Sequence, residues 1–148
     1  MNTYAEMKAR HTKEFNEFPL HFAFGDAQIK RKMDELGLTE ENIADRIVVI
    51  PSTGGFMLKE DYPRYLEMCE LRDREMKEAI AADKDGTGFI FEMFKYELSN
   101  HEYGYTMSAS QALASLGYTM NDIEANPALK NGLEKAKKAL LAEEDKKW

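Results

Sequence analysis

Residues 89–98 read FIFEMFKYEL, and this stretch decides the fold. Its only charged residues are Glu92, Lys95 and Glu97. A helix with apolar side chains on nearly every side is buried by its neighbours. The stretch therefore predicts a central buried helix, which follows a break rich in Asp and Gly at residues 83–88.

Four helices are predicted before this break, one of them a short helix that Thr39 begins, with Glu40 and Glu41 in its first turn. Residues 3–17 have an amphipathic pattern, and Pro19 follows them because proline does not continue a helix. A second helix begins at Asp26, carries an apolar stripe, and ends at Gly37, which suits a left-handed C-cap. A long helix is predicted over residues 61–82.

The strand signals are few and short. Residues 46–50 read RIVVI and give the best signal, because β-branched side chains favour strands. Residues 51–55 predict a turn, and residues 56–58 predict the antiparallel partner. The aromatic segments 21–24 and 101–105 are further strand candidates.

The C-terminal part predicts helices separated by glycine and proline. One helix covers residues 108–116, a short helix begins at Thr119, and the last begins at Asn126 and Pro127. The charged end, residues 143–148, is expected to fray.

These elements predict one fold class. With 148 residues and 43% hydrophobic content, the chain suits one compact domain over residues 1–148. The expected class is α+β, mainly helical with a small antiparallel sheet.

A short pattern returns at an offset of 80 residues without a gap. Glu17, His21, Leu36, Gly37, Thr39 and Ile43 recur as Glu97, His101, Leu116, Gly117, Thr119 and Ile123. The pattern predicts duplicated units near residues 15–45 and 95–125, with internal pseudo-two-fold symmetry. Leu-Gly-x-Thr is also ordinary helix punctuation, so convergence is the alternative.

Composition and charge limit the classes of function that the protein can have. The formal charge of −7 opposes a general affinity for nucleic acid or anionic lipid, because both need clustered Lys and Arg. The single cysteine, Cys69, excludes an intramolecular disulfide and a cysteine-based zinc site. No apolar run reaches the roughly 18 residues of a membrane span. We therefore expect a soluble, cytoplasmic protein that binds neither membrane nor nucleic acid.

Two Glu-x-x-x-His spacings suggest a metal site, Glu17 with His21 and Glu97 with His101. Residues four apart share a face of a helix, so each pair could bind one divalent ion, and pseudo-symmetry could bring the pairs together. Pro19 interrupts the first pair, and histidines that serve structure at helix ends are the alternative. We expect no metal or other cofactor, and keep the four residues as candidate ligands.

Two other motifs have simpler interpretations. Residues 83–90, DKDGTGFI, resemble the start of an EF-hand calcium loop, but the twelfth position is Phe94 where a glutamate is needed. A turn between helices is the better interpretation. Residues 112–119, ALASLGYT, resemble the start of a helix-turn-helix, but residues 120–124 are too acidic to read DNA bases.

The aromatic residues suggest two kinds of binding site. On a strand, Tyr103 and Tyr105 would share one face and are candidate partner-binding residues. A pocket lined by Phe91, Phe94 and Tyr96 is a candidate for a small ligand. No nucleophile or phosphate-binding motif is present, so the sequence nominates no catalytic residue.

Four segments carry a resemblance to a known family: HFAF at 21–24, GGFM at 54–57, FIFEMFKYELSNHEY at 89–103 and ALASLGYT at 112–119. With them the chain resembles a family of short uncharacterised proteins encoded by gut Firmicutes and often associated with their mobile elements. The resemblance covers about residues 11–141. It implies no activity, cofactor or catalytic residue, and it favours an accessory protein that works by binding.

The function expected from the sequence is therefore that of a non-enzymatic, acidic binding protein. Its partner would be another protein or a second copy of the chain, and its charge would steer it toward a basic partner. The alternative is a small metal-dependent enzyme that uses the duplicated Glu/His site.

Overall fold

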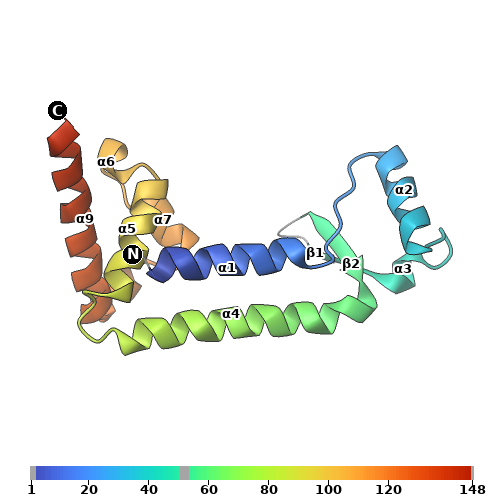
Figure 1. Ribbon diagram of the computed structural model, residues 1–148, viewed down its shortest axis with the longest axis horizontal. Coiled ribbons are helices and arrows are strands. Elements are labelled where there is room, and N and C mark those ends of the chain that lie inside the picture. The colour runs from blue at the N-terminus through green and yellow to red at the C-terminus, as the bar shows by residue number, and fades with distance from the viewer. Residues whose placement is uncertain (1–2, 51–53, 148) are drawn as a thin grey trace. The chain divides into compact units, whose positions relative to one another are not determined.

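The computed structural model describes residues 3–50 and 54–147 and is shown in Figure 1. In chain order its elements are α1 Thr3–Glu17, α2 Asp26–Leu36, α3 Ile43–Arg46, β1 Ile47–Ile50, β2 Gly55–Leu58, the 3-10 helix η1 Lys59–Asp61, α4 Tyr62–Ala82, α5 Phe89–Asn100, α6 Tyr103–Thr106, α7 Ser110–Ser115, α8 Met120–Ala125 and α9 Pro127–Lys147. Helices make up 72% of the described residues, and the two strands form a small antiparallel sheet. The predicted α+β, mainly helical class is confirmed.

The described residues form two compact units. Residues 3–10 and 74–147 belong to unit 1, and residues 11–73 belong to unit 2. In the sequence, unit 2 is therefore an insertion into unit 1. The expectation of one domain over residues 1–148 stays a prediction.

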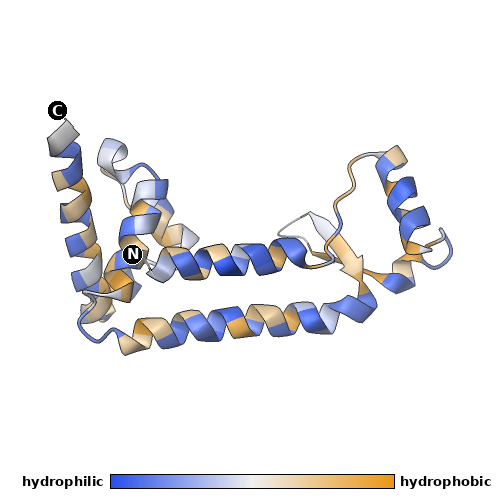
Figure 2. Ribbon diagram, in the orientation of Figure 1, coloured by the Kyte–Doolittle hydropathy of each residue, from blue (hydrophilic) through white to orange (hydrophobic). Residues whose placement is uncertain are grey.

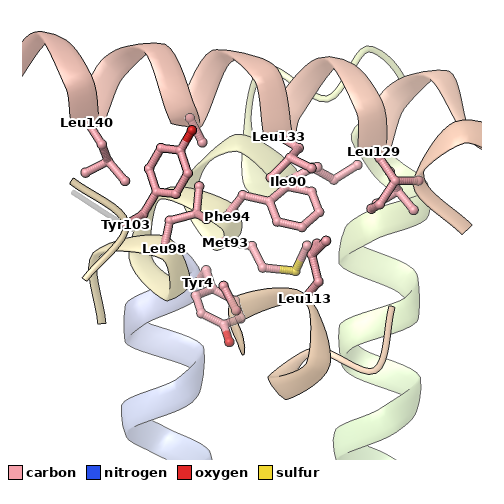
Figure 3. Close-up of a cluster of buried hydrophobic side chains, with 13 residues drawn as sticks. Tyr4, Ile90, Met93, Phe94, Leu98, Tyr103, Leu113, Leu129, Leu133 and Leu140 are labelled. Atoms are coloured by element: carbon pink, nitrogen blue, oxygen red, sulfur yellow. The ribbon is translucent and has the colours of Figure 1, made fainter. Parts of the chain in front are cut away.

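Unit 1 is built around α5. This helix packs along α9 and also contacts α6 and α7. Figure 3 shows leucines of α9 reaching toward the apolar residues of α5, with Tyr4 of α1 and Leu113 of α7 on the other side. The buried residues of α5 are Ile90, Met93, Phe94, Glu97 and Leu98. The predicted central buried helix is confirmed.

Two glycines allow the turn at residues 83–88 to approach α9 closely. Gly86 has a φ of 80°, and a Cβ on it would lie 2.0 Å from the carbonyl oxygen of Ala128. A Cβ on Gly132 of α9 would lie 2.7 Å from the carbonyl oxygen of Gly86 in the turn. Both distances are far below van der Waals contact, so the packing requires glycine at both positions.

Unit 2 contains the predicted hairpin. Strands β1 and β2 pair antiparallel, from Ile47 opposite Leu58 to Ile50 opposite Gly55. The predicted turn at residues 51–55 falls partly on residues 51–53, which lie outside the described residues.

The strand expected at residues 21–24 is reduced to a single bridge. His21 pairs with Phe56 on β2, through backbone hydrogen bonds of 2.8 and 2.9 Å. Residues 22–24 have no regular secondary structure. The strand prediction for these three residues is wrong.

The strand predicted at residues 101–105 is also wrong. The chain forms α6 there, because the N–H of Thr106 donates to the carbonyl of Glu102 at 2.9 Å. The N–H of Met107 donates to the carbonyl of Tyr103 at 2.8 Å. Alternating aromatic residues imitate the period of a strand, but these hydrogen bonds are local and helical.

Both glycines of the sequence repeat end a helix in the same way. Gly37 and Gly117 have φ values of 69° and 79°, in the left-handed region. The residue after each glycine donates its N–H to the carbonyl five positions earlier, at 2.8 and 2.9 Å. This is the predicted C-cap, which satisfies carbonyls that the helix leaves unpaired.

Both threonines of the repeat also make matching hydrogen bonds. The N–H of Thr39 donates to Oδ1 of Asn42, and the N–H of Thr119 donates to Oδ2 of Asp122, both at 2.8 Å. The N–H groups of Asn42 and Asp122 donate back to the threonine hydroxyls, at 3.3 and 3.2 Å. The local structure repeats at this junction, as helix punctuation alone would require.

The last helix extends further than expected. α9 begins at Pro127, and Oδ1 of Asn126 accepts hydrogen bonds from the N–H groups of Ala128 and Leu129 at 3.0 and 3.2 Å. The helix runs to Lys147, so residues 143–147, which were expected to fray, are helical. In the parts of the chain that are described, no helix is both long and apolar enough to cross a membrane.

Candidate functional site

Glu97 is a charged side chain buried in the core of unit 1, with only 2% of its surface exposed. Its Oε1 accepts hydrogen bonds from the Tyr4 hydroxyl at 2.9 Å and from the Lys8 ammonium at 2.5 Å. Its Oε2 accepts one from the Ser115 hydroxyl at 3.1 Å. Tyr4 and Lys8 are four residues apart, so one face of α1 presents both donors.

These donors keep Glu97 ionised. Burial alone would raise the pKa of Glu97, but the hydrogen bonds from Lys8 and Tyr4 outweigh it and hold the pKa below its usual range. Burial first, and then the charge of Glu97, raise the pKa of Tyr4. The carboxylate is therefore an anchor for the start of α1. The spacing of Glu97 and His101 made Glu97 a candidate metal ligand, and nothing in the sequence indicated its three hydrogen-bond donors.

His101 lies beside this network. It ends α5, and its N–H donates to the backbone carbonyl of Glu97 at 3.0 Å. Its Nε2 lies 3.8 Å from Oε2 of Glu97. The predicted approach of the two side chains is thus present, but protein donors already occupy both carboxylate oxygens.

Glu17 and His21 lie in unit 2 and have different surroundings. Glu17 is the exposed last residue of α1, 3.9 Å from the Lys13 ammonium. The His21 ring contacts the Phe56 ring at a centroid distance of 5.6 Å. Burial, followed by the charge of Lys32, lowers the pKa of His21.

The two Glu/His pairs therefore differ in structure. Across residues 3–50 and 54–147, no group of three or more His, Cys, Asp or Glu side chains is arranged to hold a metal ion. Among the described residues, neither Glu/His pair has a third metal-binding side chain beside it. The four-residue metal site stays a prediction.

The calcium-like segment forms a turn that caps α5. Oδ2 of Asp83 accepts hydrogen bonds from the N–H groups of Gly88 and Ile90, at 3.0 and 2.9 Å. Oδ1 of Asp85 accepts from the backbone N–H and the hydroxyl of Thr87, at 3.0 and 2.7 Å. The predicted turn between two helices is confirmed, and its carboxylates serve the backbone.

The aromatic candidates separate into buried and exposed residues. Tyr103 is buried in the core, whereas 87% of the Tyr105 side chain is exposed. The two do not share a face, so the surface predicted from the pair is reduced to Tyr105. Phe94 is fully buried in the core, and Phe91 and Tyr96 are partly buried against it, so the ligand pocket lined by these three residues stays a prediction.

Unit 2 leaves much of its apolar surface uncovered. Its buried hydrophobic residues are Leu38, Ile50 and Met57. Its exposed ones are Phe22, Phe24, Ile29, Val49, Leu66 and Leu71. Figure 2 shows hydrophobic colour along the segment that leads into α2 and along β2. Apolar side chains that gather on one exposed surface mark interaction sites, whereas apolar side chains exposed singly are common.

Several of these apolar side chains lie on α2 or just before it. Ile29, Met33 and Leu36 form its apolar stripe at helical spacing, yet no residue of α2 is buried. Phe24 lies just before the helix, is 74% exposed, and donates its N–H to Oε1 of Gln28 at 2.8 Å. We call Phe24, Ile29, Met33 and Leu36 the α2 surface. Phe24 and Ile29 are exposed, whereas Met33 and Leu36 are half-buried. Sequence periodicity indicated the stripe but could not show how much of it is exposed.

Comparison with known proteins gives one match. A protein family described as "Family of unknown function (DUF7659)" matches residues 3–139. No curated protein and no solved structure matches the chain. The match agrees with the expected resemblance to an uncharacterised family over most of the chain.

Proposed function

The chain belongs to the DUF7659 family, whose function is unknown, and we propose that it is a non-enzymatic protein-binding protein. The observation that carries this proposal is α2, an amphipathic helix in which no residue is buried. Amphipathic helices commonly bind partners by laying an apolar face into a groove or against another helix.

Unit 1 shows what a covered helix looks like in the same chain. α5 buries four apolar side chains, and α9 contributes buried leucines. Fully burying one such side chain contributes about 1.5–3 kcal/mol. The α2 surface is only partly exposed, so covering it would gain less per residue. Association costs about 4 kcal/mol or more in lost translational and rotational freedom. The free energy gained by burying the α2 surface therefore favours a weak or transient complex.

Charge and setting refine the proposal. Acidic residues outnumber basic ones by 27 to 20, which favours steering toward basic partners over most of the surface. The resemblance to proteins of mobile elements supports a role as an accessory protein of such an element, acting in the cytoplasm.

Site-specific photocrosslinking tests the proposed function. A photoreactive amino acid replaces Phe24 in cells that make the protein naturally, and we expect a covalent adduct with another polypeptide chain. Glu134, an exposed residue of α9, is the matched control position. Adducts at neither position, or equally at both, would overturn the proposal.

A further inference from the structure

We propose that the α2 surface binds the α2 surface of a second copy of this chain, with the two helices antiparallel and related by a two-fold axis. The inference rests on the proposed protein-binding function and names its partner. The interaction is isologous, so each copy contributes the same residues.

The charge order along α2 is self-complementary in this arrangement. The helix reads DAQIKRKMDEL, so the basic run Lys30–Lys32 precedes the acidic pair Asp34 and Glu35. When two copies run antiparallel, the basic run of one lies opposite the acidic pair of the other. A parallel arrangement would place each basic run opposite itself and repel.

The helical positions support the same pairing. At 100° per residue, Lys30 and Asp34 lie on one side of the apolar stripe, and Lys32 and Glu35 lie on the other. A two-fold axis perpendicular to both helices brings like sides together. Lys30 then faces Asp34 of the second copy, and Lys32 faces Glu35 of the second copy.

The apolar residues fit the same axis. With the axis near Met33, Ile29 lies opposite Leu36 of the second copy, because the two residues are about equally far from the axis. The Phe24 side chain lies before α2 and is therefore close to the C-terminal end of the second helix. This would cover the α2 surface of both copies at once.

The charged groups are available for this contact. Within the described chain, Lys30 and Asp34 form no ion pair. Lys32 lies 3.1 Å from Glu35 of its own helix, in an exposed pair of the kind that contributes little and exchanges readily. An 11-residue helix buries less than the roughly 800 Å² per partner of a standard interface, so we expect a dimer that dissociates in the micromolar range.

Charge reversal on the full-length protein tests the proposal. Analytical ultracentrifugation at about 1–500 μM should show a monomer–dimer equilibrium. The variant Lys30→Glu/Lys32→Glu and the variant Asp34→Lys/Glu35→Lys should each weaken the dimer at least about tenfold. An equimolar mixture of the two should restore association, because the reversed charges again face opposite charges. The rescue excludes misfolding as the cause of the loss.

The control is Lys135→Glu/Lys138→Glu, which reverses two exposed charges on α9 and should leave dimerisation unchanged. Wild-type protein that is monomeric at all concentrations, or reversed variants that still dimerise, would overturn the inference. The crosslink at position 24 separates the two proposals. A monomer that crosslinks a different protein refutes self-association and leaves the binding function standing, whereas a monomer with no crosslink refutes both.

Discussion

The Lys8 ammonium lies 2.5 Å from the Glu97 carboxylate, although 89 residues separate them in the sequence. The two partners differ in environment, because Lys8 is partly exposed and Glu97 is almost completely buried. The contact fastens the start of α1 to the core of unit 1. Removing Lys8 would leave the buried carboxylate with only the hydroxyls of Tyr4 and Ser115 as donors and with no opposite charge, so the loss of the contact should be measurable.

Glu97→Gln should lower the free energy of unfolding by about 1–3 kcal/mol, because the neutral amide loses the charge-assisted hydrogen bond from Lys8. Because Lys8 is partly exposed, water screens its charge, and this limits the loss of stability to the stated range. Urea denaturation measures the change. Glu6→Gln, at an exposed position of α1, should change stability by less than about 0.5 kcal/mol. Equal effects of the two substitutions would contradict the anchoring role.

The lowered pKa of Glu97 predicts a loss of stability in acid. A glutamate in the unfolded chain titrates near pH 4.3, so the unfolded state takes up this proton first as the pH falls. The contribution of Glu97 is therefore complete above that pH and is lost as the pH falls through the lower value of the folded state. The stability difference between wild type and Glu97→Gln should shrink between pH 7 and pH 3. A difference that does not depend on pH would refute this account.

Gly86→Ala should destabilise the protein more than Gly117→Ala. Both glycines have positive φ values, so both substitutions carry a backbone cost of about 1–2 kcal/mol. A Cβ on Gly117 meets no atom within 4 Å, whereas one on Gly86 overlaps the carbonyl of Ala128. Thermal unfolding of the two variants isolates the steric part, which we expect to add at least about 2 kcal/mol. Equal melting temperatures would show that the turn and α9 separate easily.

Thr39→Ala and Thr119→Ala should each cost about 1 kcal/mol, because each removes the hydroxyl that accepts a backbone N–H at the start of the next turn. Denaturant titration of both variants measures the cost. Thr39→Ser and Thr119→Ser keep the hydroxyl and should retain most of the stability. A loss at only one of the two sites would mean that the two junctions are not energetically equivalent.

Sequence reasoning succeeded where the signal was local. The apolar composition of residues 89–98 predicted a buried helix, and the β-branched run at residues 46–50 predicted the hairpin. Glycine and threonine placed the junctions at residues 36–39 and 116–119, because their hydrogen bonds involve only neighbouring residues.

It failed where the outcome depended on distant contacts. Nothing near Glu97 shows that Tyr4 and Lys8 will donate to it, since both come from the opposite end of the chain. The spacing of Tyr103 and Tyr105 favoured a strand, but the chain forms the short helix α6 there, and the Tyr103 side chain is buried in the core. Periodicity located the stripe on α2 without showing whether another element covers it.

The insertion of unit 2 between residues 10 and 74 has a consequence for synthesis. Lys8 leaves the ribosome long before Glu97, and at about 5–20 residues per second the delay is roughly 5–20 s. During this interval residues 3–10 lack the α5 core against which they pack, whereas the whole of unit 2 is a continuous segment that has already been synthesised. The start of α1, although it is synthesised early, can therefore complete its folding only after α5 has been synthesised.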